Sequence, residues 1–300
     1  MIGLLKRLFG NQKNTGIKVD ADTLPLPKDA TGALSGDTPA AVQPRRLFVG
    51  SAQSVGKQRD HNEDALFTLT ATLTNDDTNL PFGLFIVADG MGGHRYGEVA
   101  SGLAVRSMSS FIIGRLYSHV FGLETDPPSS SIQEILKEGV QEAHRTILQE
   151  AKGGGTTLTA VLLRGEQLTF AHVGDSRAYT ISPDGEMEIL TRDHSLVERL
   201  VELGQLTEEE AAVHPNRNVL YRALGQGEPF EADVSTVAIP KGGWILVCSD
   251  GLWGVVSEKQ ILRILEEAPT PQEACQRMVQ AANDAGGPDN ITAILVRLSD

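Results

Sequence analysis

The chain has 300 residues and a formal net charge of −13 at pH 7, with 40% hydrophobic and 22% charged residues. This is the composition of an ordinary globular protein, large enough to bury a core without disulfides or a structural metal. Two cysteines, Cys248 and Cys275, exclude a secreted disulfide scaffold and a cysteine-rich zinc site. No apolar run approaches the ~18–20 residues that span a bilayer, and the first apolar stretch is too short for a signal peptide. We therefore expect a cytoplasmic protein.

The first ten residues form a short amphipathic segment, in which Ile2, Leu5 and Phe9 share one helical face. Such a segment fits weak docking to a membrane surface or a partner. A frayed terminus is the favoured interpretation, because a helix this short is marginal alone. Residues 11–46 follow, with a mixture of Asn, Thr, Gly, Asp, Pro and Ala that predicts a disordered linker.

Charge separates this arm from the rest of the chain. Residues 1–46 hold seven basic and four acidic residues, net +3, and subtracting this from −13 leaves −16 on residues 47–300. Nucleic-acid binding requires a basic face for phosphate contacts. An acidic domain of this kind is therefore not expected to bind nucleic acid.

Residues 47–300 read as one domain. Apolar residues alternate with threonines over residues 67–73, which predicts a half-buried strand. Further strands are expected at 82–88, 157–163, 168–173, 177–181, 234–239, 244–248 and 291–298, with helices at about 97–117, 131–151, 258–267 and 271–284. Because strands mostly follow strands and helices arrive in pairs, the pattern favours an α+β fold of antiparallel sheets flanked by helices.

Four aspartates lie at the ends of predicted strands. They are Asp89 and Asp250, each followed by glycine, Asp175, preceded by glycine, and Asp289, just before the last strand. Mg²⁺ and Mn²⁺ prefer such oxygen ligands, and glycine lets a backbone carbonyl or a phosphate approach closely. Asp-Gly and Asp-Asn also form ordinary turns. That alternative explains any one of the four better than it explains all of them together.

A fifth cluster, Arg59-Asp-His-Asn-Glu-Asp-Ala65, runs into the threonine-rich strand. Arg59 can bind a phosphate with its two-pronged guanidinium, while Glu63 and Asp64 can hold or orient metal-bound water. Taken alone, the cluster is typical of a solvated charge run.

These motifs together resemble the metal-dependent Ser/Thr protein phosphatases of the PP2C (PPM) family, in their bacterial form. The matching segments, in chain order, are residues 59–65, Asp89-Gly-Met-Gly-Gly-His94, Gly155-Thr-Thr157, Gly174-Asp-Ser-Arg177, Asp193-His-Ser195, Ser249-Asp-Gly-Leu252 and Gly287-Pro-Asp-Asn-Ile291. The resemblance implies an α-β-β-α four-layer sandwich of two antiparallel sheets flanked by helix pairs. It also implies two Mn²⁺ or Mg²⁺ ions at one end of the sheets, with a third ion bound more weakly.

The resemblance assigns a role to each motif residue. Asp89 would bridge two ions, with the Gly90 carbonyl on one and with Asp250 and Asp289 on the other. Asp175 would bind the third ion, and Glu63 would act through water. Asp64 would orient water and Arg59 would bind the substrate phosphate. The implied reaction is hydrolysis of phosphoserine and phosphothreonine by a water or hydroxide that bridges two metals, without a covalent phosphoenzyme. Phosphorylated proteins, made by an opposing Ser/Thr kinase, are the implied partners.

One position departs from part of the family. Some members place a histidine general acid directly after the Asp-Gly, where this chain has Met91. Residues 196–224 resemble the family's flap, a segment beside the active site that influences substrate choice. Two alternatives to a protein phosphatase are an inactive phosphoprotein-binding module, which the four aspartates disfavour, and an enzyme for small phosphoesters, which stays open.

Overall fold

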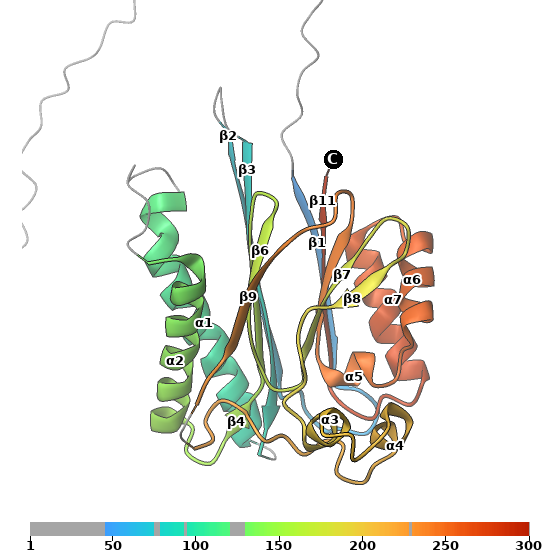
Figure 1. The fold of residues 1–300 in the computed structure, drawn as a ribbon. Helices are drawn as coiled ribbons and strands as arrows, with labels where there is room; N and C mark the ends of the chain where they lie inside the picture. The colour runs from blue at the N-terminus through green and yellow to red at the C-terminus, as the bar shows by residue number, and fades with distance from the viewer. Residues whose placement is uncertain (1–45, 75–78, 93–94, 121–129, 228–229, 300) are drawn as a thin grey trace, which may run out of the picture. The chain divides into compact units, whose positions relative to one another are not determined.

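The structure, a computed structural model, describes residues 46–74, 79–92, 95–120, 130–227 and 230–299. The predicted amphipathic segment and all but the last residue of the predicted linker lie outside the described residues. The described part belongs to one compact unit, Gln43–Asp300. Within it, two sheets pack face to face and a pair of helices covers the outer face of each (Figure 1).

The first sheet is antiparallel and has the strand order β2-β3-β5-β6-β9. Its strands are β2 (Asp64–Thr74), β3 (Asn79–Met91), β5 (Leu158–Arg164), β6 (Gln167–Val173) and β9 (Asp233–Ala238), and the short β4 (Gly155–Thr156) pairs with the end of β3. Helices α1 (Arg95–Val120) and α2 (Ile132–Glu150) pack against it. Ser131 begins α2 with a capping box that includes Glu134.

The second sheet is also antiparallel, with the order β1-β11-β10-β7-β8. Its strands are β1 (Leu47–Ser54), β7 (Arg177–Ile181), β8 (Met187–Ile189), β10 (Trp244–Cys248) and β11 (Ile291–Leu298). Helices α6 (Glu258–Glu267) and α7 (Pro271–Asp284) cover it, and three short helices, α3 (Leu196–Glu202), α4 (Glu208–Ala212) and α5 (Asp250–Trp253), lie near one end (Figure 1).

Alternation along the central strands builds three apolar layers. On β3, Leu84 and Ile86 face α1 and α2, whereas Phe85 and Val87 face the other sheet. On β11, Ile294 meets the residues between the sheets, and its neighbours pack toward α7. Because both faces of these strands are buried, their sequences are continuously apolar rather than alternating. The polar residues at the strand ends are thereby left at the rim.

The predicted fold is confirmed, and all the expected strands and helices occur. The bounds of α6 and α7 agree with the predicted ranges because each helix has a clear start signal, Ser257 for α6 and Thr270 with Pro271 for α7. Strands β1, β4 and β8 and the three short helices were not predicted. None of the helices in the described ranges combines the length and hydropathy that crossing a membrane requires.

Candidate active site

The predicted site residues gather where the ends of the two sheets meet. Asp64 begins β2 and lies directly opposite Asp89 of β3 in the antiparallel register. From the second sheet, Asp250 begins α5 just after β10, and Asp289 precedes β11. Asp175 lies in the turn between β6 and β7. Residues far apart in sequence therefore converge because their strands end on the same rim.

Asp89 differs in one respect from its predicted position at the end of a strand. Strand β3 continues to Met91, since Gly90 pairs with Thr156 and Met91 with Gly155. The pairing with β4 holds the Asp89 backbone in place. Its N–H donates to Thr157 Oγ1 at 2.9 Å, and its carbonyl accepts from Thr157 N at 2.9 Å.

A cavity of about 210 Å³ lies at this rim. The residues that line it are Arg59, Glu63, Asp89, Gly90, Met91, Gly92, Thr157, Asp175, Asn218, Leu220, Asp250 and Asp289. Every predicted site residue except Asp64 is among them. The structure thus brings together side chains that the sequence had linked only by their position beside strands.

Asp64 lies behind this lining, buried between the sheets. Its Oδ2 accepts hydrogen bonds from Thr292 Oγ1 of β11 at 2.6 Å and from Ser249 Oγ, directly after β10, at 2.8 Å. Burial raises the pKa of Asp64 to about 7, and the charges of Asp250 and Asp289 add to this, while the two hydroxyl donors oppose it. Asp64 therefore connects the two sheets with one carboxylate.

The carboxyl groups of Asp89 and Asp250 line the same cavity. Burial raises the pKa of Asp250 to about 6, with a further contribution from Asp289. Burial also raises the pKa of Asp89 well above its ordinary value, and the nearby carboxylates Asp64, Asp250 and Asp175 add to the effect. Such clustered negative charge is costly unless protons or cations offset it.

Two oxygens at this site fit a cation. Within the described residues, Oδ1 of Asp64 and Oδ1 of Asp250 are buried and have no hydrogen-bond partner. Buried polar atoms in proteins almost always have a hydrogen-bond partner. Two buried carboxylate oxygens that lack one, beside other carboxylates, are therefore suited to bind a metal ion. The donors are all oxygens, which matches Mg²⁺ or Mn²⁺ rather than a soft metal.

The described side chains are not arranged as a complete set of metal ligands around one point. No group of three or more His, Cys, Asp or Glu side chains in the described ranges converges on a single point suited to an ion. Asp289 is instead held by Arg59, whose Nη2 lies 2.6 Å from Asp289 Oδ2. Mg²⁺ typically keeps several waters and takes only one or two carboxylates. Two carboxylates and a nearby backbone carbonyl are therefore enough ligands for such an ion, and the residues present fit Mg²⁺ or Mn²⁺.

Glu63 and Asp289 are joined through Asn290. Its Oδ1 accepts from Glu63 N at 2.8 Å, and its Nδ2 donates to the carbonyls of Val55 and His61. The Glu63 carboxylate lies 3.0 Å from His61 Nε2. Asn290 thus fixes the motif that begins at Arg59 against the loop that carries Asp289.

Two glycines allow these loops to pack closely. A Cβ on Gly251 would lie 2.0 Å from the Asn290 carbonyl oxygen, and one on Gly90 would lie 2.3 Å from the Gly97 carbonyl oxygen. The glycine after each aspartate was expected to admit a carbonyl or a phosphate. The described neighbours are backbone carbonyls, one before β11 and one in the first turn of α1, so both glycines are needed for packing.

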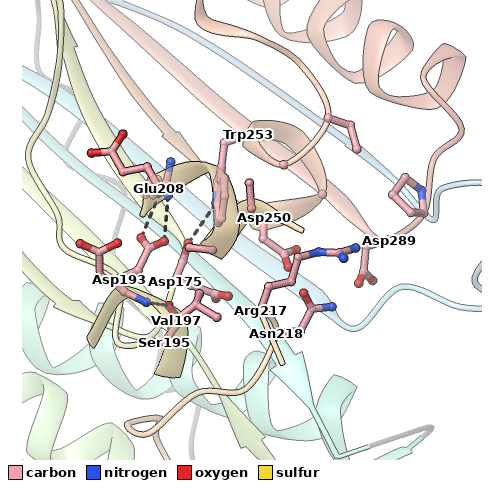
Figure 2. A pocket seen from close by; sticks show the side chains of 18 of the residues that line it. Asp175, Asp193, Ser195, Val197, Glu208, Arg217, Asn218, Asp250, Trp253 and Asp289 are labelled. Carbon is pink, nitrogen blue, oxygen red and sulfur yellow. Dashed lines mark hydrogen bonds and ion pairs between the residues drawn. The ribbon is translucent and has the colours of Figure 1, made fainter. Parts of the chain in front are cut away.

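A larger pocket of about 810 Å³ adjoins the site and extends under the flap (Figure 2). Asp175, Asp250 and Asp289 line it together with residues of α3 and α4. The predicted flap, residues 196–224, is closed at its base by a bridge between Ser195 and Leu220. Arg217 and Asn218, near its end, face the same pocket.

Several contributing residues received no role from the sequence. They are Thr157, Asn218, Ser249, Trp253, Asn290 and Thr292, all of which touch or line the site. Thr292 shows why such residues are overlooked: threonine is common in strands, so its presence in an apolar strand signals no function. One signal was available, since Thr157, Ser249 and Asn290 lie inside the quoted motif segments. Cys248 is fully buried and burial raises the pKa of its thiol, so it serves as a packing residue beside the site.

Comparison with known proteins finds relatives that are all described as phosphatases. Residues 48–291 match the family model described as protein phosphatase 2C. The serine/threonine phosphatase stp of Listeria innocua is 38% identical over 247 residues, covering 80% of this chain and 92% of that protein. The protein phosphatase PhpP of Streptococcus pneumoniae is 34% identical over 258 residues, covering 82% and 95%. The catalytic domain of the phosphatase PstP, solved with two manganese ions, superposes with a TM-score of 0.67 at 32% identity, covering 85% and 99%.

Proposed function

The chain belongs to the protein phosphatase 2C family, and from this membership we propose how its own residues carry out the reaction. The protein is a metal-dependent serine/threonine phosphatase. The observation that carries the residue assignments is the convergence of the motif carboxylates on one small cavity that also holds Arg59.

The metal ligands are proposed as follows. Asp89, the Gly90 carbonyl, Asp250 and Asp289 would hold two Mn²⁺ or Mg²⁺ ions, with Asp89 contributing to both sites, Gly90 to one, and Asp250 and Asp289 to the other. Asp175 would hold a third, weaker ion, and Glu63 would act through water. When bound, the ions neutralise phosphate charge and lower the pKa of water, which makes hydroxide available at neutral pH.

Arg59 is proposed to bind the substrate phosphate. Its side chain is half exposed at the mouth of the cavity and is paired there with Asp289. An arginine binds phosphate oxygens with two parallel N–H donors, so it can hold the group in a fixed orientation. We propose that the guanidinium exchanges its Asp289 contact for the phosphate when substrate enters.

Asp64 is proposed to orient the attacking water. One of its oxygens is fixed by Thr292 and Ser249, and the other is without a hydrogen-bond partner in the described residues. Water, rather than a side chain, is proposed as the nucleophile, so no covalent phosphoenzyme forms. The Thr157 hydroxyl is the single side-chain hydroxyl among the described lining residues of the smaller cavity, and it is already bonded to Asp89 N and Ser176 Oγ.

The leaving alkoxide also needs a proton. Met91 lines the cavity, and its sulfur accepts from Gln226 Nε2 at 3.4 Å. No histidine is among the described residues that line this cavity. We propose that water supplies the proton.

The substrates are proposed to be proteins phosphorylated by an opposing Ser/Thr kinase in the cytoplasm. The pocket under the flap provides room for the protein around the phosphorylated side chain. Weak docking through residues 1–10 would add a second, separate contact with a membrane or a partner.

Phosphate release from a phosphothreonine peptide, with added Mn²⁺ and with EDTA, tests this assignment. We expect Mn²⁺-dependent hydrolysis, and a loss of more than about a hundredfold in kcat for Asp89→Ala, because metal stabilisation of the transition state is worth several kcal/mol. Asp184→Ala is the matched control, since Asp184 is an exposed aspartate in the turn between β7 and β8. A higher kcat/KM for small phosphoesters than for any phosphopeptide would contradict a protein substrate. If folded, Mn²⁺-bound protein released phosphate from neither the peptide nor an aryl phosphate, the result would indicate a binding module.

A further inference from the structure

Trp253 contacts the loop that presents Asp175. Its indole Nε1–H donates to the Asp175 backbone carbonyl at 3.0 Å, and the two residues lie together at the wall of the pocket in Figure 2. Trp253 ends α5, the one-turn helix that begins with Asp250. One short element therefore carries a carboxylate of the site and also a hydrogen bond to the neighbouring loop.

The face of the indole ring is covered by a cation. The guanidinium carbon of Arg177 lies 3.5 Å from the Trp253 ring centroid, at stacking distance. Arg177 is itself fixed, because its Nε and Nη2 donate to the two carboxylate oxygens of Asp193 at 3.0 and 2.8 Å. Both side chains are largely buried, with exposed fractions of 22% and 8%. The ring is consequently held in one orientation, with its N–H aimed at the loop.

The opposite side of the same loop is held by His194. His194 N donates to the Gly174 carbonyl at 2.7 Å, and Gly174 N donates to His194 Nδ1 at 3.1 Å. His194 directly precedes Ser195, the residue before the predicted flap. The loop at Asp175 is thus fixed on one side to the start of the flap and on the other to α5.

We propose that Trp253 is a positioning residue that fixes the Asp175 loop to α5 and so sets the affinity of the metal ion held by Asp175. The inference rests on the proposed role of Asp175 as a ligand. Side chains that fix metal ligands through hydrogen bonds commonly change metal affinity 10–100-fold when they are replaced. The indole N–H is the group that distinguishes Trp253 from a packing residue.

Trp253→Phe keeps an aromatic face for Arg177 and removes the N–H donor. Mn²⁺ binding to the full chain, measured by titration calorimetry, is expected to weaken about tenfold at the weakest site and to stay unchanged at the others. Trp244→Phe is the matched control, because Trp244 is the other tryptophan of the chain and also lies beside an arginine, Arg297. It lies at the far end of β10 from Asp250. Equal binding by Trp253→Phe and wild type would overturn the inference.

A double-mutant cycle with Asp175→Ala separates positioning from general packing. If Trp253 acts through Asp175, adding Trp253→Phe to Asp175→Ala causes no further loss of Mn²⁺ binding. An equal loss in both backgrounds would mean that Trp253 supports the fold and not the ligand. If Asp175→Ala alone leaves all binding unchanged, the ligand role of Asp175 fails and the inference fails with it.

A second measurement does not depend on replacing Trp253. In the Trp244→Phe protein, Trp253 is the single tryptophan, so its fluorescence reports on this loop alone. Filling the weakest Mn²⁺ site is expected to change that emission, and Asp175→Ala is expected to abolish the change. Emission that stays constant while the weakest site fills would overturn the inference.

Discussion

At the scale of single residues, Asp64 shows how the site depends on groups outside the cavity. One carboxylate oxygen receives two hydroxyl donors, from β11 and from the residue after β10, and the other is left for a ligand. Donors of this kind fix the direction of a carboxylate in a way that burial alone cannot. The orientation of Asp64 therefore depends on Thr292 and Ser249 as much as on its own backbone.

Thr292→Val tests this dependence, because valine keeps the shape of threonine and removes the donor. We expect kcat to fall about tenfold with little change in KM, since hydrogen bonds to a charged group contribute about 1.5–3 kcal/mol. Thr169→Val is the control, because Thr169 is also buried and its hydroxyl lies 3.0 Å from that of Thr236, at the edge of the first sheet and away from the site. Equal kinetics for Thr292→Val and wild type would show that Asp64 does not need this donor.

At the scale of elements, β6 carries a buried histidine that makes stability depend on pH. His172 is fully buried beside Thr159 of β5, and its Nε2 lies 3.0 Å from the Arg192 carbonyl. Burial lowers the pKa of His172 to about 3, and the nearby His194 adds to this, while the Arg192 carbonyl and Asp233 oppose it. The native protein therefore holds His172 neutral at pH values where the unfolded chain would protonate it.

Acidification is consequently expected to destabilise the fold. The pKa of His172 is lower in the folded than in the unfolded state, so between about pH 6.5 and pH 3 only the unfolded state gains this proton. The free energy of unfolding should fall by on the order of 1 kcal/mol per pH unit below pH 6 from this residue. His172→Gln should reduce that slope in urea titrations from pH 7 to pH 4. An unchanged slope would contradict a neutral buried His172.

The elements also show what could be predicted from the sequence and why. Helix α7 could be bounded because Thr270 and Pro271 mark its start and its apolar face has a clear period. Strand β8 has only three residues, and α4 buries none of its side chains, so neither carries a hydrophobic pattern. The site aspartates were found because each lies beside the end of a predicted apolar strand. Thr292 and Trp253 were missed because their roles depend on neighbours from distant segments.

At the scale of the whole molecule, all the proposed catalytic and metal-binding residues lie within residues 59–289. A protein that begins at Arg46 should therefore retain its activity toward an aryl phosphate to within about twofold, since it keeps every one of these residues. Arg46 is kept because its N–H donates to Ser299 Oγ and its carbonyl accepts from Ser299 N. A large loss of kcat in a folded protein of this length would assign a catalytic role to residues 1–45. Retained activity with lost membrane or partner binding would support docking through residues 1–10.

The place of β11 in the second sheet has a consequence for biosynthesis. This strand, the last in chain order among the described residues, lies between β1, the first, and β10. On the ribosome, β1 and β10 emerge long before the strand that joins them, and Asp289 and Thr292 emerge with it. The nascent chain therefore has an incomplete sheet and an incomplete site until residues 291–298 have left the exit tunnel. Phosphatase activity becomes available only when translation of the domain has ended.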